Sequence, residues 1–312
     1  MKKYRAAVLG YYGFGNLGDE LLLSACLEMF RRCGVRREEV VVLTNSPCNE
    51  PSVNRWHYGE VVRALRQSES LLLGGGGLFQ DTTSVKSCVW YWGIVRLARL
   101  LGCKVWALGQ SVGPLRTRAG RKFAGNALRA CDVVHVRDEA SLNLAESLGC
   151  RNVVLGSDLV MTLAAGAGGR VGAPAACTLV NLRPCEGLDS FVRIIAPNLD
   201  GRVIGAALSD EDIPALRALG LREIVRVRSL GEASALWAGA SRTIGMRLHF
   251  GVLSRIFGTP LALMPYDPKV SEFAIQSGVP CITTEWHEPV MPLPVPECRT
   301  AIDALCREIL AL

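Results

Sequence analysis

The sequence predicts an α/β fold made of two Rossmann-like parallel-sheet domains that face a cleft. Three observations favour it. Short apolar runs of strand length alternate with segments of helical periodicity. Most of these runs end in a polar, glycine-containing cluster. A run of small residues, 164–176, divides the alternation into two series, so we expect an N-terminal domain over 1–163, a linker over 164–176 and a C-terminal domain over 177–312.

Composition narrows the class of protein. The chain has 312 residues, 49% of them hydrophobic, which suits about two soluble domains. Its twelve cysteines are scattered without a CxxC pair, so we expect reduced thiols, no disulfide scaffold and no metal site. No apolar run reaches the roughly 20 residues that span a bilayer. We therefore expect a cytoplasmic protein whose membrane contact, if it has any, is peripheral at the inner face.

The N-terminal domain opens with a strand, a glycine loop and a helix. Ala6–Tyr12 is apolar, a loop with Gly13, Gly15 and Gly18 follows, and Leu21–Arg32 has helical periodicity. The glycine spacing fits the dinucleotide fingerprint only loosely, but such a loop can bring backbone N–H groups close to an anion. Asp19 either caps the helix or faces the cleft as an acid or base.

Five further strands and two helices follow in this domain. The third strand runs directly into the four glycines Gly74–Gly77, a pattern that indicates a close backbone approach to a ligand. The predicted strands are 39–44, 71–73, 104–108, 133–136 and 153–155, and the helices are 90–101 and 141–148. Since ligands bind at the carboxyl ends of parallel strands, the polar clusters at these ends can converge in space.

The alternation resumes after the linker. Strands are predicted at 177–182, 202–207, 223–227 and 260–264, and helices at 233–240, 249–257 and 301–312. Between two of these elements, Arg247 and His249 stand two residues apart at a helix start. The pair is either a surface arginine with a capping or core histidine, or an anion-binding fork beside a group that transfers protons near pH 7.

Seven of these clusters together resemble the polysaccharide pyruvyl transferase family, most closely its cell-surface-anchoring (CsaB-type) branch. They occur in the family's order and comprise 13–20 (GFGNLGDE), 75–81 (GGGLFQD), 110–114 (QSVGP), 136–141 (VRDEAS), 181–184 (NLRP), 245–249 (GMRLH) and 266–270 (YDPKV). The chain departs from the family pattern at Leu159 and Cys185, where proline and an aromatic residue are usual; both departures concern the acceptor side.

The resemblance implies a GT-B-like fold and transfer of pyruvate from phosphoenolpyruvate, a co-substrate, onto a sugar as a ketal. No cofactor is implied. In the CsaB-type branch the acceptor is an N-acetylmannosamine residue of a lipid-linked secondary cell-wall polymer, and the pyruvylated polymer anchors surface-layer proteins.

Phosphoenolpyruvate carries a phosphate and a carboxylate, which suit cations and N–H donors. Given the resemblance, we expect Arg137 and Arg247 to clamp these anions, with Arg183 as a third cation. His249 is expected to be the principal acid and base, assisted by Asp19 or Asp81. The remaining candidates for substrate binding are Asn16, Gly75, Gly76, Gly77 and Lys269.

Other polar and aromatic residues carry weaker expectations. His57 and His287 lie in loop-like surroundings, and His135 alternates within a strand as a core residue does. The aromatic side chains of residues 90–92 either stack on a sugar or, as is commoner at helical spacing, belong to the core.

Two rival functions stay open at this stage. One is a glycosyltransferase of the same architecture with a nucleotide-sugar donor, and the other is a non-catalytic relative that binds a glycan or phosphate. The sequence shows no basic helix and no basic stripe interleaved with aromatic residues, so we expect no nucleic-acid partner.

Overall fold

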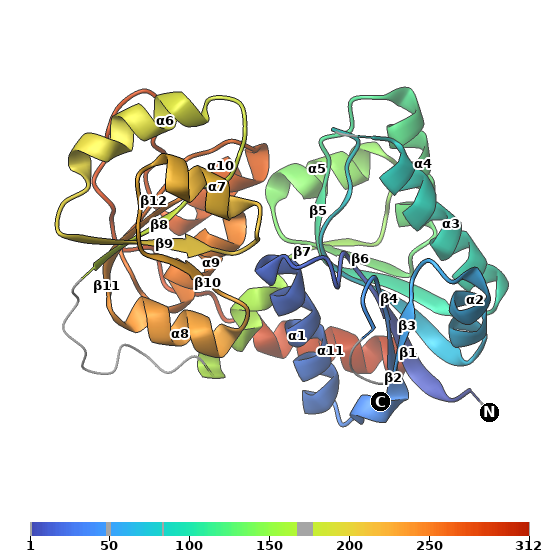
Figure 1. The fold of residues 1–312 in the computed structure, drawn as a ribbon. Coiled ribbons are helices and arrows are strands. Elements are labelled where there is room, and N and C mark those ends of the chain that lie inside the picture. The colour runs from blue at the N-terminus through green and yellow to red at the C-terminus, as the bar shows by residue number, and fades with distance from the viewer. Residues whose placement is uncertain (1, 48–50, 83, 167–176, 312) are drawn as a thin grey trace. The chain divides into compact units, whose positions relative to one another are not determined.

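The computed structural model describes residues 2–47, 51–82, 84–166 and 177–311 (Figure 1). Two compact units account for the chain. The first comprises Met1–Phe14, Leu22–Thr162 and Glu297–Leu312, and the second comprises Gly15–Leu21 and Leu163–Pro296. This division differs from the expected boundaries in two places: the C-terminal helix groups with the first unit, and Gly15–Leu21 groups with the second. The expected linker lies outside the described residues from residue 167 onward.

The first unit is built on a seven-stranded, wholly parallel sheet with strand order β3-β2-β1-β4-β5-β6-β7. The strands are β1 (Tyr4–Leu9), β2 (Val40–Thr44), β3 (Ser52–Asn54), β4 (Ser68–Phe79), β5 (Lys104–Val112), β6 (Val133–Val136) and β7 (Val153–Leu155). The central strands are buried on both faces, which is why they read as continuous apolar runs rather than alternating ones.

Helices cover both faces of this sheet. They are α1 (Leu17–Arg32), α2 (Tyr58–Arg66), α3 (Lys86–Leu100), α4 (Arg118–Arg129), α5 (Glu139–Ser147) and α11 (Arg299–Leu310), with 3₁₀ turns η1 (Arg37–Glu39) and η2 (Leu159–Gly166). A bidentate ion pair between Arg32 and Asp303 joins α1 to α11, with N–O distances of 2.7 and 2.8 Å. This pair links the last helix to the first unit although it follows the second in sequence.

The second unit contains a five-stranded parallel sheet with order β10-β9-β8-β11-β12. Its strands are β8 (Cys177–Asn181), β9 (Arg202–Ala207), β10 (Ile224–Arg226), β11 (Ala240–Gly245) and β12 (Leu261–Leu263). Its helices are α6 (Leu188–Ile195), α7 (Asp212–Ala218), α8 (Leu230–Ala238), α9 (Leu248–Ile256) and α10 (Pro268–Ser277), with 3₁₀ turn η3 (Ala196–Asn198). Two parallel sheets confirm the predicted α/β class.

The glycine run at 74–77 is part of β4 and not a loop, because β4 continues to Phe79 and pairs with β5 along this stretch. The strand needs two of these glycines for packing. A Cβ on Gly74 would lie 2.3 Å from the hydroxyl of Tyr12, and one on Gly75 would lie 2.7 Å from a methyl of Leu22. Packing of α1 and its preceding loop onto the sheet therefore explains part of the run.

The eleven described cysteines are all free, and most are buried; Cys48 lies outside the described residues. Burial raises the pKa of the Cys26 thiol to about 12. No helix within the described ranges is both long and apolar enough to cross a bilayer. The same residues hold no group of three or more histidine, cysteine or acidic side chains arranged to bind a metal ion.

Candidate active site

Three strands of the second unit end side by side. Gly245 at the end of β11 pairs with Asn181 of β8 on one side and with Leu263 of β12 on the other. The segments that leave these strands carry the candidate residues Arg183, Arg247, His249 and Lys269. Parallel register therefore gathers at one sheet edge residues that span more than eighty positions of sequence, as expected for an α/β site.

His249 lies in the first turn of α9 and packs directly against Gly18 in the first turn of α1. A Cβ on Gly18 would lie 2.1 Å from the imidazole Nδ1, closer than any real side chain allows. Gly18 is thus the residue that admits the imidazole. Gly18 is visible in the sequence, but the requirement for glycine at this position comes from its contact with His249, which is far away in the chain.

Asp19, the neighbour of Gly18, is partly buried and lies near both His249 and Lys269. Burial raises its pKa from 3.8 to about 6, while the charges of His249 and Lys269 act in the opposite direction. Asn16 orients the carboxylate: its Nδ2 donates to Oδ2 of Asp19 at 2.6 Å, and its Oδ1 accepts from the N–H of Gly18 at 3.2 Å. A carboxyl that titrates near 6 beside an imidazole is suited to proton transfer near neutral pH.

Arg247 is already engaged. Its Nε lies 2.7 and 2.9 Å from the two carboxylate oxygens of Asp212, and its Nη2 lies 2.6 Å from one of them. Asp212 is fully buried and also accepts from the N–H of Leu208 at 2.9 Å. The Arg247 N–H donates to Oδ1 of Asn181 at 3.0 Å. The geometry therefore commits the Nε edge of this guanidinium to the turn before α9, while its buried Nη2 forms an ion pair with Asp212 but no hydrogen bond within the described residues.

Arg183 and Lys269, the other two cations at this edge of the sheet, have different contacts. Arg183 lies with its guanidinium 4.9 Å from the ring centre of Tyr266, and its Nη1 donates to the hydroxyl of that tyrosine at 3.1 Å. The Nε of Arg183 is buried without an acceptor among the described residues. Lys269 stands in the first turn of α10, with its Nζ 3.3 Å from a carboxylate oxygen of Asp267. Arg183 therefore keeps donor capacity for an anion.

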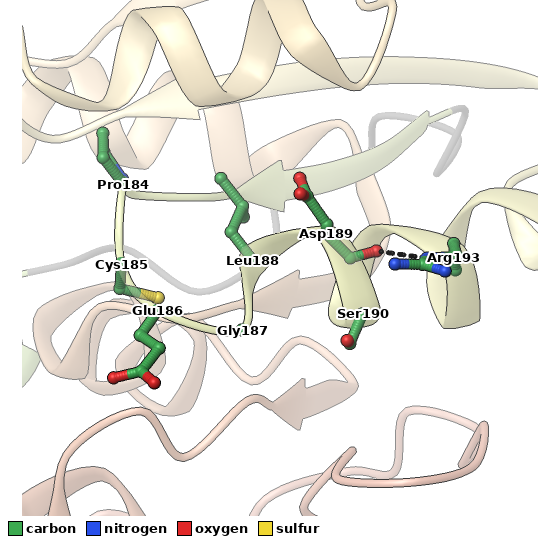
Figure 2. A pocket seen from close by; sticks show the side chains of 8 residues that line it. All are labelled: Pro184, Cys185, Glu186, Gly187, Leu188, Asp189, Ser190 and Arg193. Carbon is green, nitrogen blue, oxygen red and sulfur yellow. Dashed lines mark hydrogen bonds between the residues drawn. The ribbon is translucent and has the colours of Figure 1, made fainter.

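The second unit contains a cavity of about 490 Å³, whose lining begins at Pro184, the residue after Arg183. It is lined by residues 184–190 and Arg193, which belong to the loop before α6 and to the first turns of that helix (Figure 2). The lining includes the carboxylates of Glu186 and Asp189 and the hydroxyl of Ser190. Such groups accept hydrogen bonds from hydroxyl-rich ligands.

In the first unit, Arg137 is buried at the end of β6. Its Nη1 donates to Asp158 at 2.8 Å, and its Nε lies 3.9 Å from Asp138. Asp138 caps α5 by accepting from the N–H of Ser141 at 2.7 Å. The expected anion clamp is thus also part of a buried network of carboxylates.

Asp81 has a different role from Asp19. It accepts hydrogen bonds from the N–H of Arg116 at 2.6 Å and from the N–H and hydroxyl of Thr117 at 2.8 and 2.6 Å. Burial alone would raise the pKa of Asp81, but these hydrogen bonds outweigh it and the pKa is lowered. A carboxylate so held anchors the loop before α4 and is a poor base.

The three glycines expected to bind substrate differ among themselves. Gly75 and Gly76 have φ angles of +73° and +91°, which favour glycine whatever lies nearby. Gly77 has a negative φ, is exposed, and has nothing within 4 Å of its Cβ position. Of the three, Gly77 is the one whose backbone is open to a ligand.

The exposure of the three remaining histidines separates a core residue from two surface residues. His135 is a core residue, as expected: its Nδ1 accepts from the N–H of Gly109 at 3.1 Å, and burial lowers its pKa to about 4. His57 and His287 are well exposed.

Sequence reasoning missed Arg55, a buried residue whose guanidinium lies 4.0 Å from the ring centre of Trp90. It also missed Asp212 and Tyr266 as partners of the conspicuous arginines. The local sequence around each of these residues carries no signal of its role, which becomes visible only from its contacts in the structure.

The family model for polysaccharide pyruvyl transferases matches residues 16–268. The chain belongs to this family. The matched range contains every candidate residue from Asn16 to Arg247 and His249, and ends just before Lys269. A search among curated proteins found no match.

Solved structures show the fold to be GT-B-like. UDP-GlcNAc 2-epimerase from Methanocaldococcus jannaschii superposes with a TM-score of 0.64 at 12% identity, covering 98% of this chain and 99% of that one. The S. aureus MnaA–UDP structure gives 0.61 at 9% identity, covering 99% and 88%. Anabaena HepE in complex with UDP gives 0.52 at 12%, covering 97% and 90%. At these identities the likeness concerns the fold alone.

Proposed function

We propose that this protein is a CsaB-type pyruvyl transferase, which moves the pyruvate of phosphoenolpyruvate onto two hydroxyls of one sugar and releases phosphate. Membership of the family supports the reaction class. The observation that carries the proposal is the acid–base pair of His249 and Asp19, packed over Gly18 at the sheet edge of the second unit.

The pair supplies what ketal formation requires. His249 gives a proton to the methylene carbon of phosphoenolpyruvate, and the adjacent carbon becomes electrophilic. A sugar hydroxyl attacks that carbon, and its proton passes to the Asp19 carboxylate, which returns it to the imidazole. The carbon–oxygen bond to phosphate breaks, the second hydroxyl adds to the same carbon, and its proton leaves with phosphate. A carboxyl of pKa about 6 is ionised at neutral pH and can act in this way.

The surrounding cations suit the donor's two anionic groups. In the proposed complex, Lys269 and Arg183 contact the phosphate and carboxylate, and Asn16 keeps the Asp19 carboxylate in place. The buried Nε of Arg183 supports this role. Arg247 acts through the turn that positions His249, because Asp212 already binds most of its guanidinium. For the first unit taken by itself, we propose Arg137 and the exposed backbone of Gly77 as contacts for an anionic group of a substrate.

We propose that the acceptor is N-acetylmannosamine of a lipid-linked cell-wall polymer precursor, modified at the cytoplasmic face of the membrane. The cavity beside 184–193 is the proposed seat of an acceptor sugar, because Glu186, Asp189 and Ser190 can accept hydrogen bonds from its hydroxyls. Departure from the family pattern at Cys185, inside this lining, then tunes which sugar is accepted.

The test measures phosphate release from phosphoenolpyruvate with and without an acceptor that carries N-acetylmannosamine. Wild-type protein should release phosphate only with acceptor. His249→Ala and Asp19→Asn should each lose about 10²–10⁴-fold in turnover, the usual contribution of a general acid or base. The matched control His57→Ala removes an exposed imidazole and should leave the rate unchanged.

Undiminished turnover in His249→Ala would remove the imidazole from the mechanism. Absence of phosphate release with any acceptor, together with saturable binding of a uridine nucleotide, would favour the nucleotide-sugar donor instead. UDP is bound in the solved MnaA and HepE structures that share the fold, which makes it the nucleotide to titrate.

A further inference from the structure

The first unit contains a long stretch without acidic residues. Between Asp81 and Asp132 the chain has no aspartate or glutamate, although the protein as a whole has 29. The same stretch carries nine basic residues: Lys86, Arg96, Arg99, Lys104, Arg116, Arg118, Arg121, Lys122 and Arg129. It includes all of α3 and α4. The expectation that the chain has no basic helix is therefore wrong.

Helices α3 and α4 pack against each other on one face of the sheet (Figure 1). The ring of Trp92 on α3 meets that of Phe123 on α4 edge to face at a centroid distance of 5.0 Å. On α4, Gly120, Ala124, Ala127 and Leu128 point inward, while Arg118, Arg121 and Lys122 are exposed. The inward side is small and apolar, so the outward side collects the charge.

The exposed stripe of α3 mixes cations with apolar side chains. Lys86, Val89, Gly93, Arg96 and Leu100 recur at spacings of three and four and so share one side of the helix. Leu100 is 77% exposed and Val89 is 37% exposed, both high values for apolar side chains. Together with Arg116, Arg118, Arg121 and Lys122, these residues form what we call the α3–α4 face.

Five of the six cations of this face lack an acidic partner within the described residues, whereas the charge of Arg116 acts on the carboxylate of Asp81. Within the described ranges, Lys86, Arg96, Arg118, Arg121 and Lys122 form no ion pair. The exposed cations of α3 and α4 that do find partners lie at the helix ends. Arg99 pairs with Asp132 at 2.8 Å, and Arg129 bonds to Asn126 and to a backbone carbonyl. The positive charge of the face is thus available to a partner.

We propose that the α3–α4 face docks the protein on an anionic phospholipid surface. Exposed cations attract anionic headgroups, and exposed Val89 and Leu100 can enter the boundary between headgroups and acyl chains. An acid-free face avoids the repulsion that a carboxylate would meet at such a surface. The apolar side chains favour lipid over nucleic acid, whose phosphates would engage the cations alone. Docking on lipid is independent of which reaction the site catalyses.

The test is co-sedimentation of the full chain with vesicles of phosphatidylcholine alone or mixed with phosphatidylglycerol. Wild-type protein should bind the anionic vesicles and not the neutral ones, and added salt should release it. The triple variant Arg118→Gln, Arg121→Gln, Lys122→Gln should bind about 100-fold more weakly, because each cation near the surface contributes about fivefold.

A matched triple variant separates the face from net charge. Arg217→Gln, Arg222→Gln, Arg228→Gln removes three exposed arginines of the second unit and changes the net charge equally. It should bind anionic vesicles as the wild type does.

Equal weakening by both triple variants would overturn the proposal, as would equal binding to neutral and anionic vesicles or no binding to either. Wild-type protein that binds duplex DNA more tightly than anionic vesicles would assign the face to nucleic acid and also overturn it. These measurements need no turnover, so their failure is distinct from failure of the proposed reaction.

Discussion

The Asp19→Asn variant tests whether the buried, ionised carboxylate of Asp19 lowers the free energy of unfolding of the protein. Asn keeps the size of the side chain and an oxygen that can accept from Asn16, but it cannot ionise. The pKa of Asp19 is raised from 3.8 to about 6, chiefly by burial. At 1.36 kcal/mol per pKa unit, ionised Asp19 makes the folded state less stable by about 3 kcal/mol.

The direction with pH follows from proton binding. Because the folded protein holds this proton more tightly than the unfolded chain does, ionisation favours unfolding. Wild-type protein should therefore lose stability relative to Asp19→Asn as the pH rises from about 4 to about 6. Above pH 6 the difference should stay constant near 3 kcal/mol, and below pH 4 it should vanish because the carboxyl is protonated in both states.

Urea unfolding of both proteins at several pH values measures this difference. Glu146→Gln is the control, since Glu146 is exposed and forms no ion pair within the described residues; it should show no comparable gain. A variant no more stable than wild type at pH 8 would refute the reasoning, as would a gain that persists unchanged at pH 4. Higher stability with lost turnover is the pattern expected where function opposes stability.

The remaining predictions concern glycine contacts and one buried ion pair. Gly18→Ala should leave α1 folded yet reduce turnover at least about 100-fold, because the new methyl displaces the catalytic imidazole; Gly93→Ala, in open space on α3, should leave the rate unchanged. Asp212→Ala should lower the free energy of unfolding by about 3–5 kcal/mol in urea, since it leaves a buried guanidinium with only the exposed carboxylate of Glu211 at 3.6 Å; a loss below about 1 kcal/mol would contradict this. Gly75→Ala should lower the melting temperature by strain and collision with α1, whereas Gly77→Ala should leave it unchanged and raise the KM for phosphoenolpyruvate.

The positive charge of the α3–α4 face is visible in the sequence only over a long interval. The interval from Asp81 to Asp132 lacks acidic residues entirely, yet no part of it is a dense basic run. Charge patterning is usually sought over a few adjacent residues, and here the cations are spaced by helix turns and divided between two helices. Packing of α3 against α4 brings them onto one face.

The sequence by itself indicated the α/β class, most of the parallel strands and the family. It did not mark strands β3 and β11 or helices α2, α4, α6, α7 and α10. It could indicate the class and the family because buried parallel strands read as apolar runs and because polar clusters at strand ends are local features. It also marked His249, Asp19 and Lys269, which the structure brings together in the second unit.

Only the tertiary structure decided what each marked residue does. Asp19 and Asp81 are the same residue type in similar glycine-rich settings. One has a raised pKa because burial dominates, and the other has a lowered pKa because three donors surround it. Likewise Arg247 is held by Asp212, 35 positions away in the chain. Desolvation and hydrogen bonding depend on neighbours in space, and for these residues the neighbours come from other segments of the chain.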